Sequence, residues 1–137
     1  MSPPQVIFFT VNDTHSKLLK IAELCHRHFE KKEHLQIVLP DQQSLDFLDA
    51  LLWRLPLSSF LPHTINPGDE ELILLSLSAF KWEKSHLLFN LTGQAYLERS
   101  DLKEIYELDD RTSDQKKQQS LARFKAYQGS GYFLATA

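Results

Sequence analysis

Gln5 to Val11 reads Gln-Val-Ile-Phe-Phe-Thr-Val, and the passage from this run into a helix pattern decides the fold class. A short β-branched and aromatic run is typical of a buried strand. The next three residues, Asn-Asp-Thr at 12–14, predict a turn and a helix N-cap. From about Thr14 to Lys32 apolar side chains recur at helical spacing, which predicts an amphipathic helix. Its apolar positions are Leu18, Ile21, Ala22, Cys25 and Phe29.

The same alternation continues along the first half of the chain. A second buried strand is predicted over Leu35 to Leu39, and Asp41 can cap a second helix that extends to about Arg54. The inner face of this helix carries Leu45, Leu48 and Leu52. Alternating strands and helices favour parallel strands joined by right-handed crossovers. We therefore predict an α/β fold in which residues 1–137 form a single three-layer domain. Its mostly parallel central sheet is flanked by helices, in a Rossmann-like topology.

The second half of the chain gives shorter patterns. Apolar runs at 72–77, 87–91 and 105–108 predict three more strands, and residues 112–128 predict a last helix. The Asn-Pro-Gly-Asp sequence at 66–69 predicts a turn. The apolar residues 132–134 are expected to dock on the body of the protein. Residues 98–117 are the most densely charged and are interpreted as a mobile surface connection.

Composition restricts the possible classes of function. The chain has 137 residues, of which 42% are hydrophobic, which suits one globular domain. Its net charge of −3 argues against broad nucleic-acid binding, and we expect no sequence-specific nucleic-acid contact. The chain contains no run of about 18 apolar residues, so no membrane span is predicted. The N-terminus has no secretion-signal pattern. With Cys25 as the single cysteine, a reducing cytoplasm is the expected location.

The chemistry of a nucleotide site is missing from the first turn. Residues 11–17, Val-Asn-Asp-Thr-His-Ser-Lys, contain no glycine, although a phosphate cradle needs close backbone approach. Neither a Gly-x-Gly-x-x-Gly nor a Walker pattern occurs in the chain. Asp13 would also repel a phosphate at this helix end. The sequence therefore predicts a Rossmann-like fold without a nucleotide-binding loop and without a cofactor.

The histidines do not form a recognisable metal or catalytic motif. Cys25 and His28 are three residues apart, but zinc needs four ligands, or three and a water molecule. Cys25 fits the buried stripe better, and His26 and His28 fit a solvated helix face. His63 could act as a general base, but no motif places a nucleophile near it. We predict neither metal ligands nor catalytic residues.

Residues 51–63, Leu-Leu-Trp-Arg-Leu-Pro-Leu-Ser-Ser-Phe-Leu-Pro-His, combine large apolar side chains with two prolines. Pro56 and Pro62 exclude a continuous helix or a central strand here. The segment is nevertheless too apolar for an ordinary solvated loop. Two interpretations stay open: the segment packs against its own core, or it offers aromatic anchors such as Trp53 and Phe60 to another protein.

Two stretches together resemble the chi subunit of the bacterial DNA polymerase III holoenzyme. The first is Phe-Leu-Asp-Ala-Leu-Leu-Trp-Arg-Leu-Pro at 47–56, continuing through Ser-Phe-Leu-Pro-His at 59–63. The second is Leu-Ala-Arg-Phe-Lys-Ala-Tyr at 121–127, continuing to Gly-Tyr at 131–132. The opening strand with its Asn-Asp-Thr turn agrees as well. Residues 1–63 and 120–137 resemble the family in their sequence pattern. The middle of the chain resembles it only in the order of the predicted strands and helices.

The resemblance implies an adaptor of the clamp-loader assembly and not a catalyst. Chi-like proteins pair with the psi subunit and hold the acidic C-terminal tail of single-stranded-DNA-binding protein, which links the polymerase to coated template. A helicase is a further possible partner for the same aromatic patch. By this resemblance the residues facing psi or a helicase are Trp53, Pro56, Phe60, Leu61 and Pro62.

The last helix is the expected site for the acidic tail. An acidic, hydrophobic-ended tail needs cations, an apolar pocket and donors for the terminal carboxylate. The residues expected to bind it are Lys117, Leu121, Arg123, Phe124, Lys125 and Tyr127. The alternative interpretation is that Leu121 and Phe124 belong to the core and that the cations are only solvated.

The register of this helix against the family pattern has two solutions. Alignment on Lys-Ala-Tyr at 125–127 places Leu121 where the family has its tail-binding arginine. Alignment on Leu-Ala-Arg at 121–123 gives that role to Arg123 but shifts the aromatic residue. The competing class of function is a small α/β enzyme, a hydrolase or nucleotide-handling protein, on the same topology. A pocket with convergent polar groups and a glycine turn at the carboxyl ends of the strands would favour that class.

Overall fold

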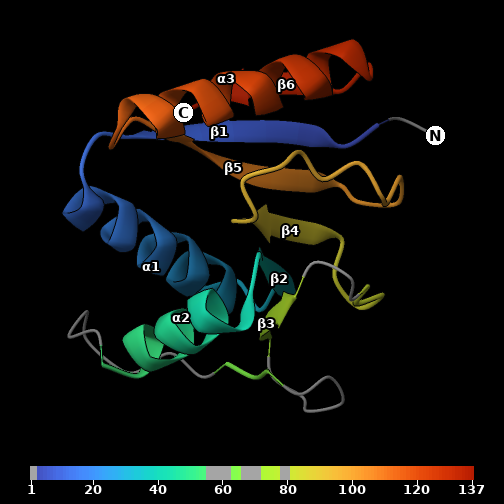
Figure 1. Cartoon of the computed structure of the whole chain (residues 1–137). Coiled ribbons are helices and arrows are strands. Elements are labelled where there is room, and N and C mark those ends of the chain that lie inside the picture. Colours follow the sequence, from blue (N-terminus) through green and yellow to red (C-terminus); the bar gives the residue numbers. More distant parts are fainter. Residues whose placement is uncertain (1–2, 55–62, 66–71, 78–80) are drawn as a thin grey trace.

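The computed structural model has a six-stranded sheet with helices on both faces, and it describes residues 3–54, 63–65, 72–77 and 81–137 (Figure 1). The strands lie in the order β3-β2-β4-β5-β1-β6, and each neighbouring pair is parallel. The strands are β1 (Gln5–Val11), β2 (Leu35–Leu39), β3 (Ile73–Leu77), β4 (Leu87–Asn90), β5 (Glu104–Asp110) and β6 (Phe133–Thr136). The helices are α1 (Thr14–Glu30), α2 (Gln42–Arg54) and α3 (Asp114–Gly129). The turn predicted at residues 66–69 lies outside the described residues.

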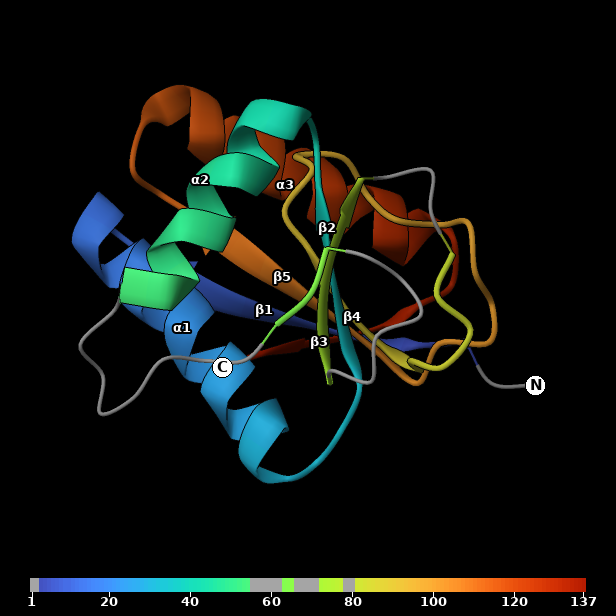
Figure 2. The ribbon, with the colours of Figure 1, turned by 90° about the horizontal axis from the view of Figure 1, so that it is seen from below.

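The sheet separates two layers, which confirms the predicted three-layer α/β fold. Figure 2 shows α1 and α2 beside each other on one face, with the segment 91–103 on the opposite side of the strands. The helix α3 contacts β5 and β6 on that opposite face. The apolar C-terminal residues dock as predicted, because β6 pairs with β1 and forms one edge of the sheet.

The side chains of β1 point alternately into two separate hydrophobic cores. Val6 and Phe8 point into the core beneath α3, where Phe8 meets Phe124 with ring centroids 5.5 Å apart. Phe9 and Val11 point into the larger core beneath α1 and α2. This strand is therefore buried on both faces, as expected for a strand inside a parallel sheet with helices on each side.

Side-chain caps set where the helices begin. Asp13 accepts a hydrogen bond from the Ser16 amide at 2.7 Å, and Asp41 accepts one from the Ser44 amide at 2.8 Å. These backbone bonds lower the pKa of both carboxyl groups, as expected for N-caps that are used in the ionised form. The last helix begins two residues later than predicted, because Ser113 is its cap and accepts from the Lys116 amide.

The charged segment 98–117 is not the mobile surface connection that its composition suggested. It contains β5, which lies between β4 and β1 in the sheet. At its start, the Arg99 side chain is buried and donates to the carbonyl oxygens of Trp82 and Ser85 at 3.1 and 3.0 Å. Asp101 pairs with the same guanidinium at 2.7 Å, which explains how a buried charge is tolerated here. The prediction was wrong because the charge density of the segment did not reveal these internal partners.

His28 also departs from its predicted place on a solvated face. The residue is only 4% exposed, and its ring lies 5.1 Å from that of Tyr106 on β5. Its Nδ1 atom is 2.8 Å from a carboxylate oxygen of Glu33, which follows the end of α1. The buried stripe of α1 thus includes Leu24 and His28, while Phe29 is only partly buried.

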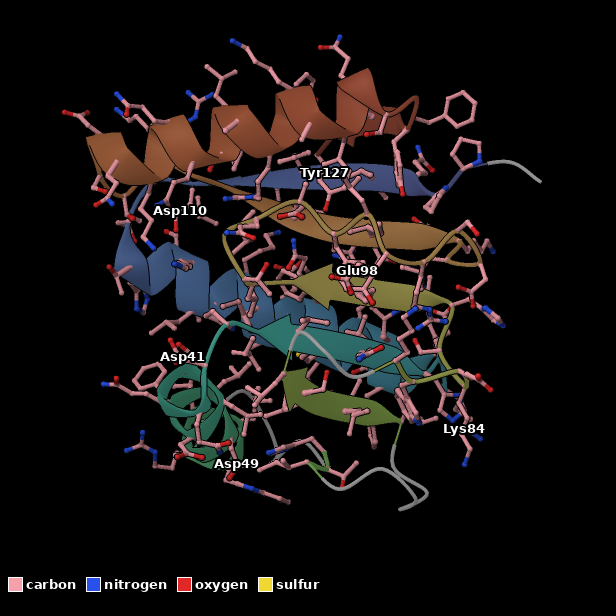
Figure 3. The ribbon with its side chains drawn as sticks, turned by 45° about the vertical axis from the view of Figure 1, so that its right-hand side comes forward. Asp41, Asp49, Lys84, Glu98, Asp110 and Tyr127 are labelled. Carbon is pink, nitrogen blue, oxygen red and sulfur yellow. The ribbon has the colours of Figure 1, made fainter. Side chains whose placement is uncertain are left out.

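A buried carboxylate on β5 joins the sheet to α3. Glu107 is 1% exposed and accepts hydrogen bonds from Arg123 Nε at 3.0 Å, Asn90 Nδ2 at 2.6 Å and the hydroxyl of Tyr127. The Tyr127 hydroxyl in turn accepts from the Tyr96 amide at 2.8 Å. Figure 3 shows Tyr127 between α3 and the strands. Burial raises the pKa of Glu107 to about 7, although Arg123 and the hydrogen bonds oppose that shift.

We predict that Glu107 makes stability fall as the pH rises. Its ordinary pKa of 4.5 is raised to about 7 in the folded chain, so the folded state binds this proton more tightly than the unfolded state does. The stabilising contribution is therefore complete below about pH 4.5 and is lost as the pH rises through 7. Urea denaturation of the parent and of Glu107→Gln at pH 5.5 and 8 should show the parent losing about 2 kcal/mol relative to the variant. A relative gain for the parent at pH 8 would mean that Arg123 lowers the pKa instead.

Candidate functional site

The described residues of the two surfaces predicted to bind partners lie at opposite ends of the molecule. Figure 1 places α2 at the end of the sheet formed by β2 and β3, and α3 over the end formed by β1 and β6. In Figure 3, Asp49 on α2 and Tyr127 beneath α3 are correspondingly far apart.

A pocket of about 430 Å³ opens between α3 and the ends of the neighbouring strands. Its lining residues come from β1, β5, β6, α3 and the turn after β5: Phe8, Asp109, Arg111, Lys117, Ser120, Leu121, Phe124 and Thr136. The side chain of Leu121 is 53% exposed at the pocket, so a large apolar group is available to solvent. We call this cavity the α3 pocket.

Two cations and one carboxylate share the α3 pocket. Arg111 Nε donates to Asp109 at 3.0 Å, and the Arg111 side chain remains half exposed. Lys117 Nζ is 3.9 Å from Asp114, at the long limit of an ion pair, and both side chains are open to solvent. Exposed pairs of this kind are weak, about 0–1 kcal/mol, so these cations can exchange their partners for an arriving anion.

The structure brings together three of the six residues predicted to bind the acidic tail. Lys117, Leu121 and Phe124 line the α3 pocket. Arg123 and Tyr127 instead point inward to Glu107 and are 7% and 0% exposed. Lys125 is exposed on α3 but does not line the pocket.

At the other predicted surface, Trp53 lies at the end of α2 and is 46% exposed. Its indole Nε1 donates to Asp49 at 3.2 Å, and its ring lies 4.4 Å from the ring of His63. The four other residues predicted for this surface lie outside the described part of the chain: Pro56, Phe60, Leu61 and Pro62. His63, considered from the sequence as a general base, has a fully buried side chain whose Nε2 is 2.7 Å from Asp49.

A second pocket lies at the carboxyl ends of the strands, where α/β enzymes bind their substrates. It measures about 470 Å³ and lies between α1 and α2, with Leu18, Leu39 and Phe47 among its mostly apolar lining residues. Lys17 and Lys116 also line it, and Lys17 is paired with Asp110 at 2.8 Å. Figure 3 shows Asp110 at the end of β5 beside the first turn of α1. No aspartate, glutamate, histidine or cysteine is among its described lining residues, so these offer no carboxylate, imidazole or thiol.

Two other structural features are absent from the described residues. Among these, no three histidine, cysteine or acidic side chains gather in a way that could hold a metal ion. No helix in the described ranges has the length and apolar character needed to cross a membrane.

Several residues that lie at the two surfaces were not identified from the sequence. Phe8, Arg111 and Thr136 belong to segments far apart in sequence, and they meet at the α3 pocket only because β1 lies between β5 and β6. At the other surface, Asp49 was missed as a partner of Trp53. Its position one helical turn before Trp53 was a usable signal, because residues four apart lie on one helix face.

Comparison with known proteins identifies the family of the chain. A protein-family model described as DNA polymerase III chi subunit, HolC, matches residues 4–135 of the 137. No curated protein gives a match. The family match covers both terminal regions that carry the resemblance in the sequence and also spans the middle of the chain. The chain belongs to the DNA polymerase III chi subunit family.

Proposed function

We propose that this protein is a non-catalytic accessory subunit of the DNA polymerase III clamp-loader assembly and that it links this assembly to single-stranded-DNA-binding protein. The family match over residues 4–135 is the observation that carries the proposal. Two surfaces at opposite ends of the molecule fit an adaptor, which has to hold two partners at once. The α3 pocket would take the acidic tail, and the region of Trp53 would take the psi subunit or a helicase.

The α3 pocket suits a peptide that is acidic and ends in a hydrophobic residue. Phe8, Leu121 and Phe124 offer apolar contact for the terminal side chain. Arg111 and Lys117 are donors for the terminal carboxylate and for acidic side chains upstream of it. The same combination of an apolar floor and cations is what recognition of a peptide C-terminus requires.

The pocket geometry favours one of the two alignments with the family pattern. With Leu121 in the position of the family's tail-binding arginine, the pocket keeps its apolar wall and takes its positive charge from Lys117 and Arg111. With Arg123 in that position, the binding cation would have to leave Glu107 and the carbonyl of Leu108, to which Arg123 Nη2 donates at 2.7 Å. Removing one partner from a buried ion pair costs about 3–5 kcal/mol, so we propose the first alignment.

Lys117→Glu is predicted to weaken tail binding about tenfold at low salt, because it replaces attraction by repulsion in a partly exposed pair. Calorimetric titration with an acidic peptide that ends in phenylalanine measures the loss, and the same peptide with an amidated C-terminus tests the carboxylate contact. Lys125→Glu is the matched control, since it makes the same charge change on the same helix outside the pocket. Equal losses in the two variants would reject the α3 pocket.

Asp109→Asn is predicted to tighten tail binding about two- to fivefold. The substitution removes the one acidic side chain that lines the described pocket and releases Arg111 from its ion pair. The gain should shrink as salt is added, because the effect is electrostatic at a partly exposed site. Unchanged affinity at low salt would show that the peptide does not reach Arg111.

Arg123→Ala is predicted to act on stability, in contrast to the pocket cations. The substitution leaves the ionised Glu107 without its cation, so at pH 8 the free energy of unfolding should fall by about 3–5 kcal/mol. Lys125→Ala on the exposed side of the same helix should change it by less than about 0.5 kcal/mol. Denaturant titrations of both variants give the comparison. A stable Arg123→Ala variant that has lost peptide binding would reverse the assignment.

Trp53→Ala is predicted to lower the affinity for the psi subunit at least tenfold with little effect on the fold, because half-exposed aromatic anchors dominate many interfaces. Surface plasmon resonance with immobilised psi measures the affinity, and circular dichroism monitors folding. Phe47→Ala provides a control, because Phe47 is 55% exposed on the same helix but lines the pocket beside α1. Loss of the folded state in Trp53→Ala would favour the alternative in which this segment is core.

A further inference from the structure

The exposed indole of Trp53 is held by contacts on its edge and on its face. Its Nε1 atom donates to Asp49 Oδ1 at 3.2 Å, one helical turn earlier on α2. The ring also lies against the imidazole of His63, with centroids 4.4 Å apart and an angle of 38° between the planes. A tryptophan that projected freely from the helix end would show neither contact.

Asp49 connects the two rings. The same Oδ1 atom that accepts from the indole lies 2.7 Å from His63 Nε2. Trp53, His63 and Asp49 therefore form a closed triangle: two hydrogen bonds to one oxygen atom and one ring contact. We call it the Trp53 triangle. In Figure 3, Asp49 lies on α2 at the β3 end of the molecule, away from α3.

The histidine of the triangle is fixed to the sheet through its neighbour. The Thr64 amide donates to the carbonyl of Ile73, and the Leu75 amide donates to the carbonyl of Thr64, both at 2.9 Å. Thr64 thus forms a parallel bridge with Leu74 at the β3 edge. Because residue 63 precedes this bridge directly, its imidazole has a defined place, and its side chain is fully buried. The indole therefore rests on a support that belongs to the folded core.

We propose that Asp49 and His63 are positioning residues that hold the Trp53 indole in one orientation at the surface, so that the psi subunit meets a preformed anchor. The inference rests on the proposed function, because it assumes that the Trp53 surface binds a partner. Immobilising a flexible side chain on binding lowers affinity, and a ring already fixed by the fold avoids that loss. Releasing the ring should weaken binding about two- to tenfold, a smaller effect than removal of the ring itself.

This role also accounts for the burial of His63. A general base has to reach a substrate, but the imidazole of His63 is covered and its Nε2 is directed at Asp49. His63 contacts the face of the Trp53 indole and the carboxylate of Asp49. These contacts suit a residue that orients Trp53. The histidine considered from the sequence as a catalytic group is thereby assigned to the binding surface.

The test follows the ring and the affinity separately. The chain contains two tryptophans, so 5-fluorotryptophan labelling gives two ¹⁹F signals, and Trp82, which is 5% exposed, serves as the internal reference. The Asp49→Ala and His63→Leu variants should move the Trp53 signal toward that of the free amino acid and leave the Trp82 signal in place. Asp49→Asn keeps an oxygen acceptor and should restore most of the parent signal. Asp46→Ala is the matched control, because Asp46 lies one turn earlier and bonds only Gln42 among the described contacts, at 2.8 Å.

Affinity for the psi subunit is measured on the same variants, with Trp53→Ala beside them. The inference predicts a two- to tenfold loss for Asp49→Ala and a larger loss for Trp53→Ala. An unmoved Trp53 signal in Asp49→Ala and His63→Leu would overturn it, and so would full affinity in variants whose ring has been released. If Trp53→Ala itself keeps full affinity, the proposed binding surface fails, whereas the ¹⁹F signals still decide whether the triangle orients the ring.

Discussion

The buried carboxylate of Glu107 on β5 connects α3 to the sheet. Glu107 receives hydrogen bonds from Arg123 and Tyr127 on α3 and from Asn90 on β4, so three elements meet at one group. Such a group is costly to bury and is tolerated here because three side-chain donors are directed at its oxygens. The network fixes the rotation of α3 about its axis: Arg123 and Tyr127, which are bonded to Glu107, face the sheet, while Leu121 and Lys125 are exposed.

The outward face of α3 follows from that rotation. With Arg123 and Tyr127 turned to the sheet, Leu121 and Phe124 come to the edge where the rings and cations of the α3 pocket gather. In the proposed role of an adaptor, rigid binding surfaces would avoid the cost of ordering side chains when a partner binds. At the α3 end a buried ion pair supplies this rigidity, and at the α2 end the contacts of Trp53 with Asp49 and His63 do so. Both surfaces are thus presented by elements whose buried sides are fixed.

Much of the fold could be predicted because its signals are local. The run at Gln5–Val11 and the capping residue Asp41 need only their neighbours in sequence to be interpreted. The inward direction of Arg123 could not be predicted, because its partner Glu107 lies in a segment whose charges suggested solvent exposure. The α3 pocket could likewise not be predicted from the sequence, because Arg111 and Thr136 are brought together there only by the order of the strands in the sheet.

We propose that the α3 pocket, and not the Trp53 surface, binds the acidic tail. Two-dimensional amide NMR of the ¹⁵N-labelled chain, during titration with an acidic peptide ending in phenylalanine, distinguishes the two surfaces. We expect the chemical-shift changes to concentrate at Phe8, Leu121 and Thr136, while the amides of Asp49 and Trp53 stay unchanged. Changes centred on the end of α2, or spread evenly over the surface, would exclude the α3 pocket as the binding site.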